Sequence, residues 1–351
     1  MMENTSDTLL TLLDPQPGST IMVYDVHASE SGALAILDDL YEQIKSYPDK
    51  SIRWVFIVST PEYQETDNII VRRYPWVKEG WHKRYYFNKV TTKKILKEFM
   101  PDQVFSLQNE GIAGYKKKQT VYLHLPFILT DHRFRMKEDG KRLWLYQNIV
   151  SKMIFKSLRK VDMTIVQTRW MKQALIEKAR VSPSKIKVLQ PDVSMNCIGH
   201  YADNKENRKH FFYPATAFTY KNHITLLKAL HYAQEHGLEN YRLDLTIEKN
   251  ENGLTRFLAD YAEQNHLQVV FGGKMPRQNV FEMYTKSVLL FPSYVESFGL
   301  PLLEAKLTGC YIIASDCPFT HDILDGYDKA FLFSETDFEA MGKLILELEN
   351  V

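Results

Sequence analysis

The sequence has few of the features that mark a secreted or membrane-spanning protein. It holds three cysteines in 351 residues, Cys197, Cys310 and Cys317, without the spacing of a disulfide framework. No apolar run reaches the length that spans a bilayer, and the first residues lack the basic start of a signal peptide. We therefore expect a cytoplasmic protein in which Cys310 and Cys317 are buried thiols.

Two common cofactor patterns are also missing. The first expected strand continues into VYDVHASESGAL, which has one glycine, Gly32, where a dinucleotide-binding fold would have G-x-G-x-x-G. This argues against a dehydrogenase. No group of His, Cys and Asp residues has the spacing of a metal site, so neither a metal nor another cofactor is expected.

Charge is distributed unevenly, although the whole chain carries a net charge of only +1. Residues 1–195 hold 30 Lys+Arg against 22 Asp+Glu, a net charge of +8, whereas the remainder carries −7. Nine basic residues lie between Arg72 and Lys97, with Glu79 as the single acid and several aromatic residues among them. We call residues 72–97 the basic aromatic segment. The asymmetry indicates that the two halves do different work.

Short β-branched or aromatic runs alternate with longer helical patterns, which predicts an α/β fold with parallel sheets and right-handed crossovers. Strands are expected at residues 20–26, 52–59, 103–107, 120–124, 163–168, 186–190, 210–215, 242–247, 268–273, 288–293, 311–315 and 330–334. The polar, turn-rich segment 194–210 is typical of a linker. The pattern predicts two doubly wound, Rossmann-like domains, residues 1–195 and 196–351, with a ligand cleft between them.

The stretch SYVESFGLPLLEAKLTGCYIIASD (293–316) carries the most specific chemical pattern. It places Glu296 and Glu304 eight residues apart around a glycine turn, among apolar neighbours where a charge is costly unless something binds it. The turn leads into an expected helix, whose N-terminal amides and Gly299 favour a phosphate. An acid on either side of such a turn predicts a site that grips both ends of a sugar nucleotide.

This stretch resembles the E-x7-E signature of retaining glycosyltransferases of family 4, which have the GT-B fold. Residues 213–230 and 161–193 extend the resemblance. It implies a glycosyltransferase that moves a hexose or deoxyhexose from a nucleotide-diphosphate sugar to a glycan acceptor, with retention at the anomeric carbon. No D-x-D run of the kind used by metal-dependent glycosyltransferases is present, so the resemblance implies a metal-independent reaction.

The resemblance also assigns roles to single residues. Glu296 would hold sugar hydroxyls, Lys221 would contact the donor diphosphate, and His124, at a strand end, would face the transferred sugar. Glu304 would bind the ribose. Thr216 stands where many family members have an arginine, so one cation is missing. The expected donor-binding residues are Gly32, Thr216, Ser297, Phe298, Gly299, Leu300 and Glu304.

Members of the family from bacterial capsule and O-antigen clusters extend lipid-diphosphate-linked sugars at the cytoplasmic face of the membrane. The resemblance therefore implies a lipid-linked glycan acceptor and peripheral attachment to the inner membrane face. The basic aromatic segment suits anionic headgroups, with rings at the interface and cations on phosphates. The residues expected on this membrane or acceptor face are Trp81, Lys83, Arg84 and Tyr85.

Other readings stay open at this stage. A solvated basic face over a packed helix would give the same pattern in residues 72–97. Nucleic acid is not expected as a partner, because no recognised nucleic-acid module accompanies the segment. A sugar-nucleotide epimerase on the same fold, or a non-catalytic binding subunit, would retain the nucleotide site, and Thr216 favours the latter. The chain ends soon after its last expected strand, so a helix crossing back to the first domain is expected to be short or absent.

Overall fold

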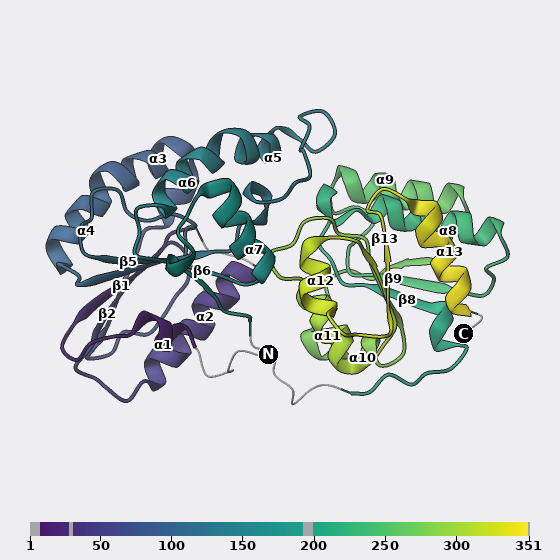
Figure 1. Cartoon of the computed structure of the whole chain (residues 1–351), viewed down its shortest axis with the longest axis horizontal. Coiled ribbons are helices and arrows are strands. Elements are labelled where there is room, and N and C mark those ends of the chain that lie inside the picture. Colours follow the sequence, from purple (N-terminus) through teal and green to yellow (C-terminus); the bar gives the residue numbers. More distant parts are fainter. Residues whose placement is uncertain (1–7, 28–30, 192–198, 350–351) are drawn as a thin grey trace. The chain divides into compact units, whose positions relative to one another are not determined.

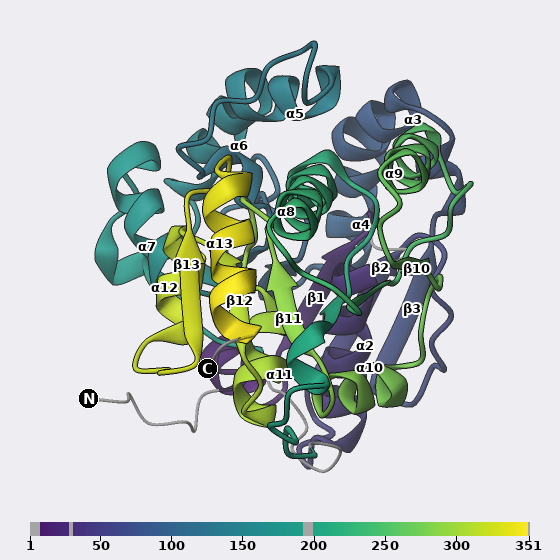
Figure 2. The same cartoon turned by 90° about the vertical axis from the view of Figure 1, so that its right-hand side faces the viewer.

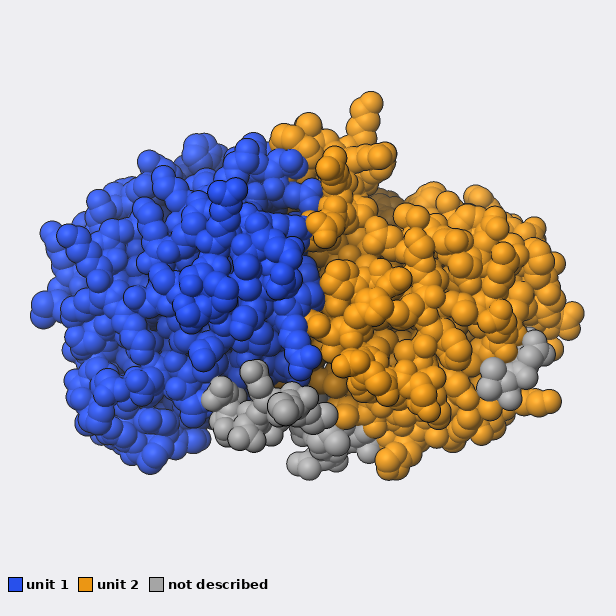
Figure 3. All heavy atoms as spheres, viewed as in Figure 1, with its two compact units in different colours: residues 1–129, 145–190 blue, residues 130–144, 191–351 orange. Residues whose placement is uncertain are grey.

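The computed structural model describes residues 8–27, 31–191 and 199–349 (Figure 1). Two compact units make up the chain, residues 1–129 with 145–190 and residues 130–144 with 191–351 (Figure 3). The boundary expected between residues 195 and 196, like Cys197, lies outside the described residues. Residues 130–144 group with the second unit, to which the sequence pattern did not assign them.

Within the described residues, the first unit contains a seven-stranded parallel sheet in the order β3-β2-β1-β4-β5-β6-β7. Its strands are β1 (Thr20–Asp25), β2 (Arg53–Val58), β3 (Ile69–Arg73), β4 (Gln103–Ser106), β5 (Lys118–Leu123), β6 (Met163–Val166) and β7 (Ile186–Val188). Strand β3 was not predicted. It is an edge strand of half-buried residues that runs directly into the basic aromatic segment, so it lacks the buried apolar run of the central strands.

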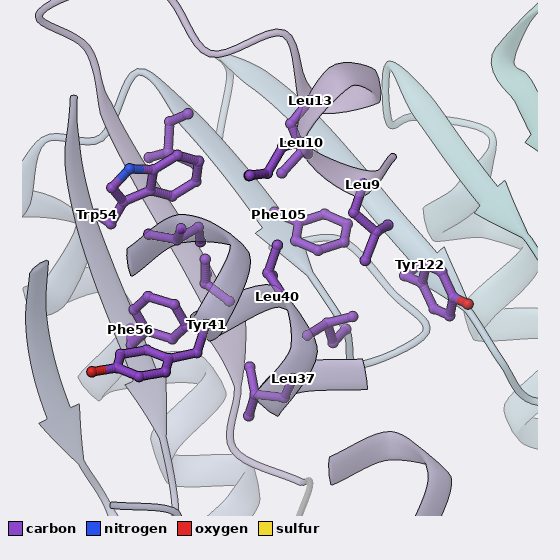
Figure 4. Close-up of a cluster of buried hydrophobic side chains, with 14 of the residues drawn as sticks. Leu9, Leu10, Leu13, Leu37, Leu40, Tyr41, Trp54, Phe56, Phe105 and Tyr122 are labelled. Atoms are coloured by element: carbon purple, nitrogen blue, oxygen red, sulfur yellow. The ribbon is translucent and has the colours of Figure 1, made fainter. Parts of the chain in front are cut away.

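Helices cover both faces of this sheet. They are α1 (Leu9–Leu13), α2 (Ser31–Ser46), α3 (Trp81–Tyr86), α4 (Thr92–Phe99), α6 (Ser151–Leu158) and α7 (Arg169–Ala174). Helix α2 buries residues spaced three and four apart, the pattern of one apolar face. Its side chains Leu37, Leu40 and Tyr41 pack with Trp54 and Phe105 of the sheet (Figure 4). A single apolar face of α2 therefore determines which side of the helix packs on the sheet.

Successive residues of the central strands point to opposite faces. Phe105 of β4 and Tyr122 of β5 pack on the side of α1 and α2. Val104 and Val121, one position earlier in each strand, pack on the other side. Because both faces are covered, the strands read as continuous apolar runs, which is why sequence pattern alone located them.

Within the described residues, the second unit contains a six-stranded parallel sheet in the order β10-β9-β8-β11-β12-β13. Its strands are β8 (His210–Tyr213), β9 (Arg242–Leu245), β10 (Val269–Phe271), β11 (Val288–Phe291), β12 (Ile312–Ser315) and β13 (Ala330–Phe333). Its helices are α8 (His223–Glu235), α9 (Gly253–Gln264), α10 (Arg277–Tyr284), α11 (Leu300–Thr308), α12 (Pro318–Leu324) and α13 (Phe338–Glu349). Every strand expected from the sequence is present in one of the two sheets. Cys310 and Cys317 are buried as expected.

The last helix, α13, packs against α8 of the same unit (Figure 2). Gly342 lies at the contact, where an added Cβ would come within 2.6 Å of Tyr232 Cδ1 and 2.9 Å of the carbonyl oxygen of Ala229. Only a residue without a side chain lets the two helices approach this closely.

We predict that Gly342→Ala lowers the free energy of unfolding by about 1–3 kcal/mol, the usual cost of inserting a carbon into a packed contact. By helix propensity alone, alanine in place of glycine would stabilise the helix by about 1 kcal/mol. A net loss of stability would therefore report the steric contact. Gly253→Ala is the matched control, because an added Cβ there has no atom within 4 Å. Chemical denaturation measures both; equal stability of the two variants would contradict the packing described for α13.

Candidate active site

Lys221 and Glu296 follow neighbouring strands of the second unit. Lys221 ends a 3-10 turn (Thr219–Lys221) that follows β8, and Glu296 lies in the turn after β11. Strand β8 pairs with β9 on one side and β11 on the other, so the strand order reverses beside it. Ligands of doubly wound folds bind at the carboxyl ends of strands at such a point. The Lys221 Nζ lies 2.5 Å from Glu296 Oε1.

Hydrogen bonds fix the backbone on the Lys221 side. Asn222 has a left-handed backbone (φ 58°), which asparagine tolerates, and immediately precedes α8. Its Nδ2 donates to the carbonyl oxygens of Pro292 at 3.1 Å and Glu335 at 2.8 Å. The hydroxyl of Tyr213 donates to the carbonyl oxygen of Lys221 at 2.7 Å. The turn that carries the lysine is therefore tied to the end of β11.

The Glu296 carboxylate is held by a second set of contacts. Ser293 Oγ donates to Glu296 Oε1 at 2.7 Å, and the hydroxyl of Ser315 donates to the carbonyl oxygen of Ser293. The exposed fraction is 17% for the Lys221 side chain and 14% for that of Glu296. Both groups are thus largely buried but remain open at one side, as a ligand-binding pair requires. A pair this buried contributes little net stability, which points to a functional role.

Gly299 follows Glu296 closely in the sequence and immediately precedes α11. Its backbone is left-handed (φ 97°), and it precedes the first helical residue, Leu300, without a side-chain cap. Amides at such a helix start are available to an anion. Phe298 is 2% exposed and belongs to the core, so only its backbone is able to take the donor-binding part expected of it.

Glu304 lies on α11 and is buried, with 8% of its side chain exposed. The hydroxyl of Tyr284 donates to Glu304 Oε2 at 3.1 Å, and Arg277 Nη2 lies 2.9 Å from Glu304 Oε1. Burial raises the pKa of Glu304, while the Arg277 charge and the Tyr284 hydrogen bond oppose that rise. The carboxylate expected to bind the ribose therefore has two protein partners that sequence reasoning missed.

Two other expected donor residues have different surroundings. Thr216 is exposed, and its carbonyl oxygen accepts from the amide of Phe218 at 2.9 Å. Gly32 is the second residue of α2, and the residues immediately before that helix lie outside the described part of the chain. Ser297 lies in the turn between Glu296 and α11, and Leu300 is the first residue of that helix.

In the first unit, His124 follows β5 at the carboxyl edge of the sheet. Its amide donates to Asn109 Oδ1 at 2.9 Å, and Asn109 itself has a left-handed backbone (φ 64°). The Nδ1 of His124 and the Nε2 of His27 are both buried without a hydrogen-bond partner among the described residues. His27 follows β1, the strand beside which this sheet reverses its order. Unsatisfied polar atoms at this edge favour a polar ligand.

The basic aromatic segment keeps only part of its charge free. Trp81 is 81% and Tyr85 61% exposed, as expected of an interaction face. Lys83, however, forms an ion pair with Glu79, the last residue of the 3-10 helix (Pro75–Glu79) just before α3. The sequence pattern alone did not indicate this pairing, which reduces the charge that Lys83 offers to a partner.

Arg84 has a different environment from Lys83. Burial, followed by the charges of Arg84 and Lys78, lowers the pKa of His27 to about 3. Lys78 Nζ donates to Thr60 Oγ1 at 3.3 Å, just beyond β2. These two cations therefore lie near the carboxyl edge of the sheet, where an anionic ligand would meet them.

Residues 130–144 contribute to the second unit close to Glu296. His132 Nδ1 lies 3.1 Å from Glu335 Oε1, and the hydroxyl of Tyr294 donates to Asp139 Oδ1 at 3.1 Å. Tyr294 is two residues before Glu296. A segment that the sequence division assigned to the first domain thus supports the turn of the candidate site.

Among the described residues, no three His, Cys, Asp or Glu side chains are grouped so that they could hold a metal ion. Metal independence stays a prediction. In the same part of the chain, no helix combines the length and apolarity needed to cross a membrane.

Comparison with known families identifies both halves of the chain. Residues 202–350 match the family Glycosyl transferases group 1, and residues 52–194 match Glycosyltransferase Family 4. The chain therefore carries the two domains of a glycosyltransferase of the GT-B type. No protein of curated function matches the sequence significantly.

Solved structures share this fold at low sequence identity. Sucrose-phosphate synthase from Thermosynechococcus elongatus matches with a TM-score of 0.69 and 12% identity, over 94% of this chain and 89% of that one. WaaG, a glycosyltransferase involved in lipopolysaccharide biosynthesis, matches with a TM-score of 0.69 and 14% identity, over 95% and 90%. HepE from Anabaena, solved with UDP and glucose, matches with a TM-score of 0.64 and 14% identity, over 93% and 89%. These similarities confirm the expected α/β fold.

We predict that His27 and His124 stay uncharged throughout the neutral range. Burial lowers the pKa of His124 to about 4, and that of His27 falls to about 3. NMR titration of the imidazole carbons measures both values. Replacing Lys78 and Arg84 by alanine should raise the pKa of His27 and change that of His124 less. A titration midpoint of about 6.5 for either histidine, the ordinary value, would contradict the burial described.

Arg277→Ala should weaken nucleotide binding most at low pH. Loss of the guanidinium raises the pKa of Glu304 further. A carboxylate with a raised pKa loses its ionised form, the form that accepts hydroxyl hydrogen bonds, as pH falls through that higher value. The Kd for a nucleoside diphosphate, measured by calorimetry from about pH 8 to about pH 5, should therefore begin to rise at a higher pH than in the wild type.

Lys274→Ala is the control for that experiment. Lys274 lies in the loop just before α10, and its replacement by alanine removes the same charge, but its side chain has no ion pair with Glu304. Its pH profile should follow the wild type. Equal displacement of both profiles would mean that the Arg277 contact with Glu304 has no special part in binding.

Proposed function

We propose that this chain is a retaining glycosyltransferase that moves a hexose or deoxyhexose from a nucleotide-diphosphate sugar to a lipid-diphosphate-linked glycan. The observation that carries the proposal is the Lys221–Glu296 pair, held at the reversal point of the second sheet. It offers one cation and one carboxylate to neighbouring parts of a single ligand. A sugar diphosphate needs both, because its phosphates are anionic and its sugar presents hydroxyl donors.

Each residue then has a defined part in the reaction. Lys221 and the amides around Gly299 hold the diphosphate and stabilise the charge that develops as it departs. Glu296 accepts hydrogen bonds from the sugar hydroxyls, and Glu304 accepts them from the ribose. In the first unit, His124 orients the transferred sugar as a neutral imidazole.

The step that we propose is a substitution on one face of the sugar. The bond between the anomeric carbon and the phosphate oxygen breaks, and the acceptor oxygen forms its bond to the same carbon on the same face. The acceptor proton passes to the departing phosphate oxygen, so no protein carboxylate has to act as base. The products are the nucleoside diphosphate and the lengthened glycan, and no metal takes part.

Two structural neighbours support the pathway part of the proposal. WaaG is a glycosyltransferase involved in lipopolysaccharide biosynthesis, and HepE was solved with UDP. We propose a corresponding place in bacterial surface polysaccharide synthesis, such as that of capsule or O-antigen. The exposed Trp81 and Tyr85 would let the protein bind the cytoplasmic face of the membrane peripherally, where a lipid-linked acceptor is found.

Release of nucleoside diphosphate from a panel of nucleotide sugars, with and without a polyprenyl-diphosphate-linked sugar, tests the proposal. Acceptor-dependent release from one donor is expected. Lys221→Ala and Glu296→Ala should each reduce kcat by about 100- to 1,000-fold, as loss of a preorganised electrostatic contact does. Lys228→Ala, an exposed lysine on α8, should have no such effect.

Two results would contradict the proposal. Tight donor binding without transfer to any acceptor would favour a non-catalytic binding subunit, for which the missing cation at Thr216 already argues. An anomeric configuration inverted in the product would exclude the retaining reaction.

A further inference from the structure

Residues 145–160, most of which are helical, expose apolar side chains that the function proposed above does not use. The helical part runs from Leu145, the last residue of α5 (Lys141–Leu145), through a π-helical turn (Tyr146–Val150) into α6, which ends at Leu158. Leu145 is 43%, Ile149 49% and Met153 64% exposed. Their spacing of four residues places them on one face of the helix. A continuous apolar stripe therefore faces away from the core.

Lysines share that outward face. Lys152 and Lys156 on α6, and Lys160 in the turn that follows it, are exposed and repeat at the same spacing of four. No Asp or Glu occurs between residues 140 and 161, and none of the three lysines has a carboxylate partner among the described residues. Unlike Lys83, they keep their full charge for a partner.

The orientation of the helix is set by its opposite face. Ile154 is 5% exposed and Leu158 is fully buried, and both pack with Val121 of β5. Because this face is packed in the core, the side chains of the apolar stripe point toward solvent. Helix α6 lies on the same side of the first sheet as α3 (Figures 1 and 2).

Helix α3 presents similar chemistry on that side. Trp81 and Tyr85 are exposed, and Lys93, Lys94 and Lys97 follow on α4 without a carboxylate partner among the described residues. An anionic bilayer offers charge at its surface and an apolar layer beneath, and it is broad enough to contact two separate helices. A groove-binding peptide would need only one of them.

We propose that the outward face of residues 145–160 is a second membrane-docking surface, which binds anionic lipid headgroups through its lysines and inserts Leu145, Ile149 and Met153 below them. It rests on the proposed function only in that a lipid-linked acceptor gives the protein a reason to bind a membrane. The lysine stems lie along the interface while their ammonium groups reach the phosphates.

Vesicle co-sedimentation of the full chain tests this surface, with phosphatidylglycerol mixed into phosphatidylcholine and with phosphatidylcholine alone. One variant replaces the lysines by glutamine and a second replaces the apolar residues by serine. The variants are Lys152→Gln/Lys156→Gln/Lys160→Gln and Leu145→Ser/Ile149→Ser/Met153→Ser. The first should bind anionic vesicles about 100-fold more weakly, since each lysine near the surface contributes about a factor of five. The second should lose about tenfold or more, while circular dichroism and thermal unfolding remain those of the wild type.

A control with equal charge loss is available on other elements of the same unit. Lys45→Gln/Lys50→Gln/Lys187→Gln removes three exposed lysines that lie outside the helix. It should keep nearly the wild-type affinity. Equal losses in the two lysine variants would mean that net charge alone drives binding, and would overturn the proposal. Wild-type protein that binds no anionic vesicle, or serine variants that bind like the wild type, would overturn it as well.

Failure of the proposed function has a different signature. Donor turnover measured without vesicles does not involve this surface, so the serine and glutamine variants should match the wild type in that assay. A wild type that binds vesicles through residues 145–160 but transfers no sugar would refute the proposed function and leave the docking surface standing. A wild type that transfers sugar but binds no vesicle would refute the docking surface and leave the proposed function standing.

Discussion

The candidate site depends on one constraint, the attachment of the turn after β8 to the end of β11. Asn222 makes it by donating two hydrogen bonds, to Pro292 and Glu335, while its own backbone occupies the left-handed region. Without that attachment, Lys221 would be an exposed loop lysine with many rotamers, and ordering it on a ligand would cost conformational entropy. With it, the cation is placed in advance beside Glu296, and the electrostatic contact needs no rearrangement when a ligand binds.

The two glutamates of the motif, Glu296 and Glu304, are both largely buried carboxylates, and different partners stabilise their charges. Glu296 has its cation on a neighbouring loop and stays partly open, so a ligand is able to compete for it. Glu304 is buried deeper, and Arg277 and Tyr284 hold it from α10. Arg277 is itself 57% exposed, so its contact lies at the solvent side of the carboxylate. A ribose that binds Glu304 would therefore meet Arg277 at the same position, which makes the arginine part of the nucleotide site under the proposed function.

The sequence predicted the elements better than the contacts between them. Alternating apolar runs located the central strands because both sheet faces are covered, whereas β3 was missed because an edge strand buries less. The proximity of Lys221 and Glu296 followed from a family resemblance. Asn222 and Arg277 were missed because their partners depend on how turns and helices after different strands meet, which no local pattern encodes. A left-handed position filled by asparagine is the one local signal that would have pointed to Asn222.

The number of basic residues along the sequence also did not predict which cations lack an ion-pair partner. The basic aromatic segment has the highest density of basic residues. However, Arg72 and Arg73 pair with Glu65 and Glu62 before β3, and Lys83 pairs with Glu79 just before α3. Charge density does not single out residues 145–160, because their lysines are fewer. They lack any acid within helical reach, however, so each lysine stays unpaired beside an exposed apolar stripe. If the proposed docking surface is correct, a better sequence signal for a surface that binds anionic lipid is the absence of acids along one helix face. Exposed ion pairs within reach remove charge at almost no cost in stability.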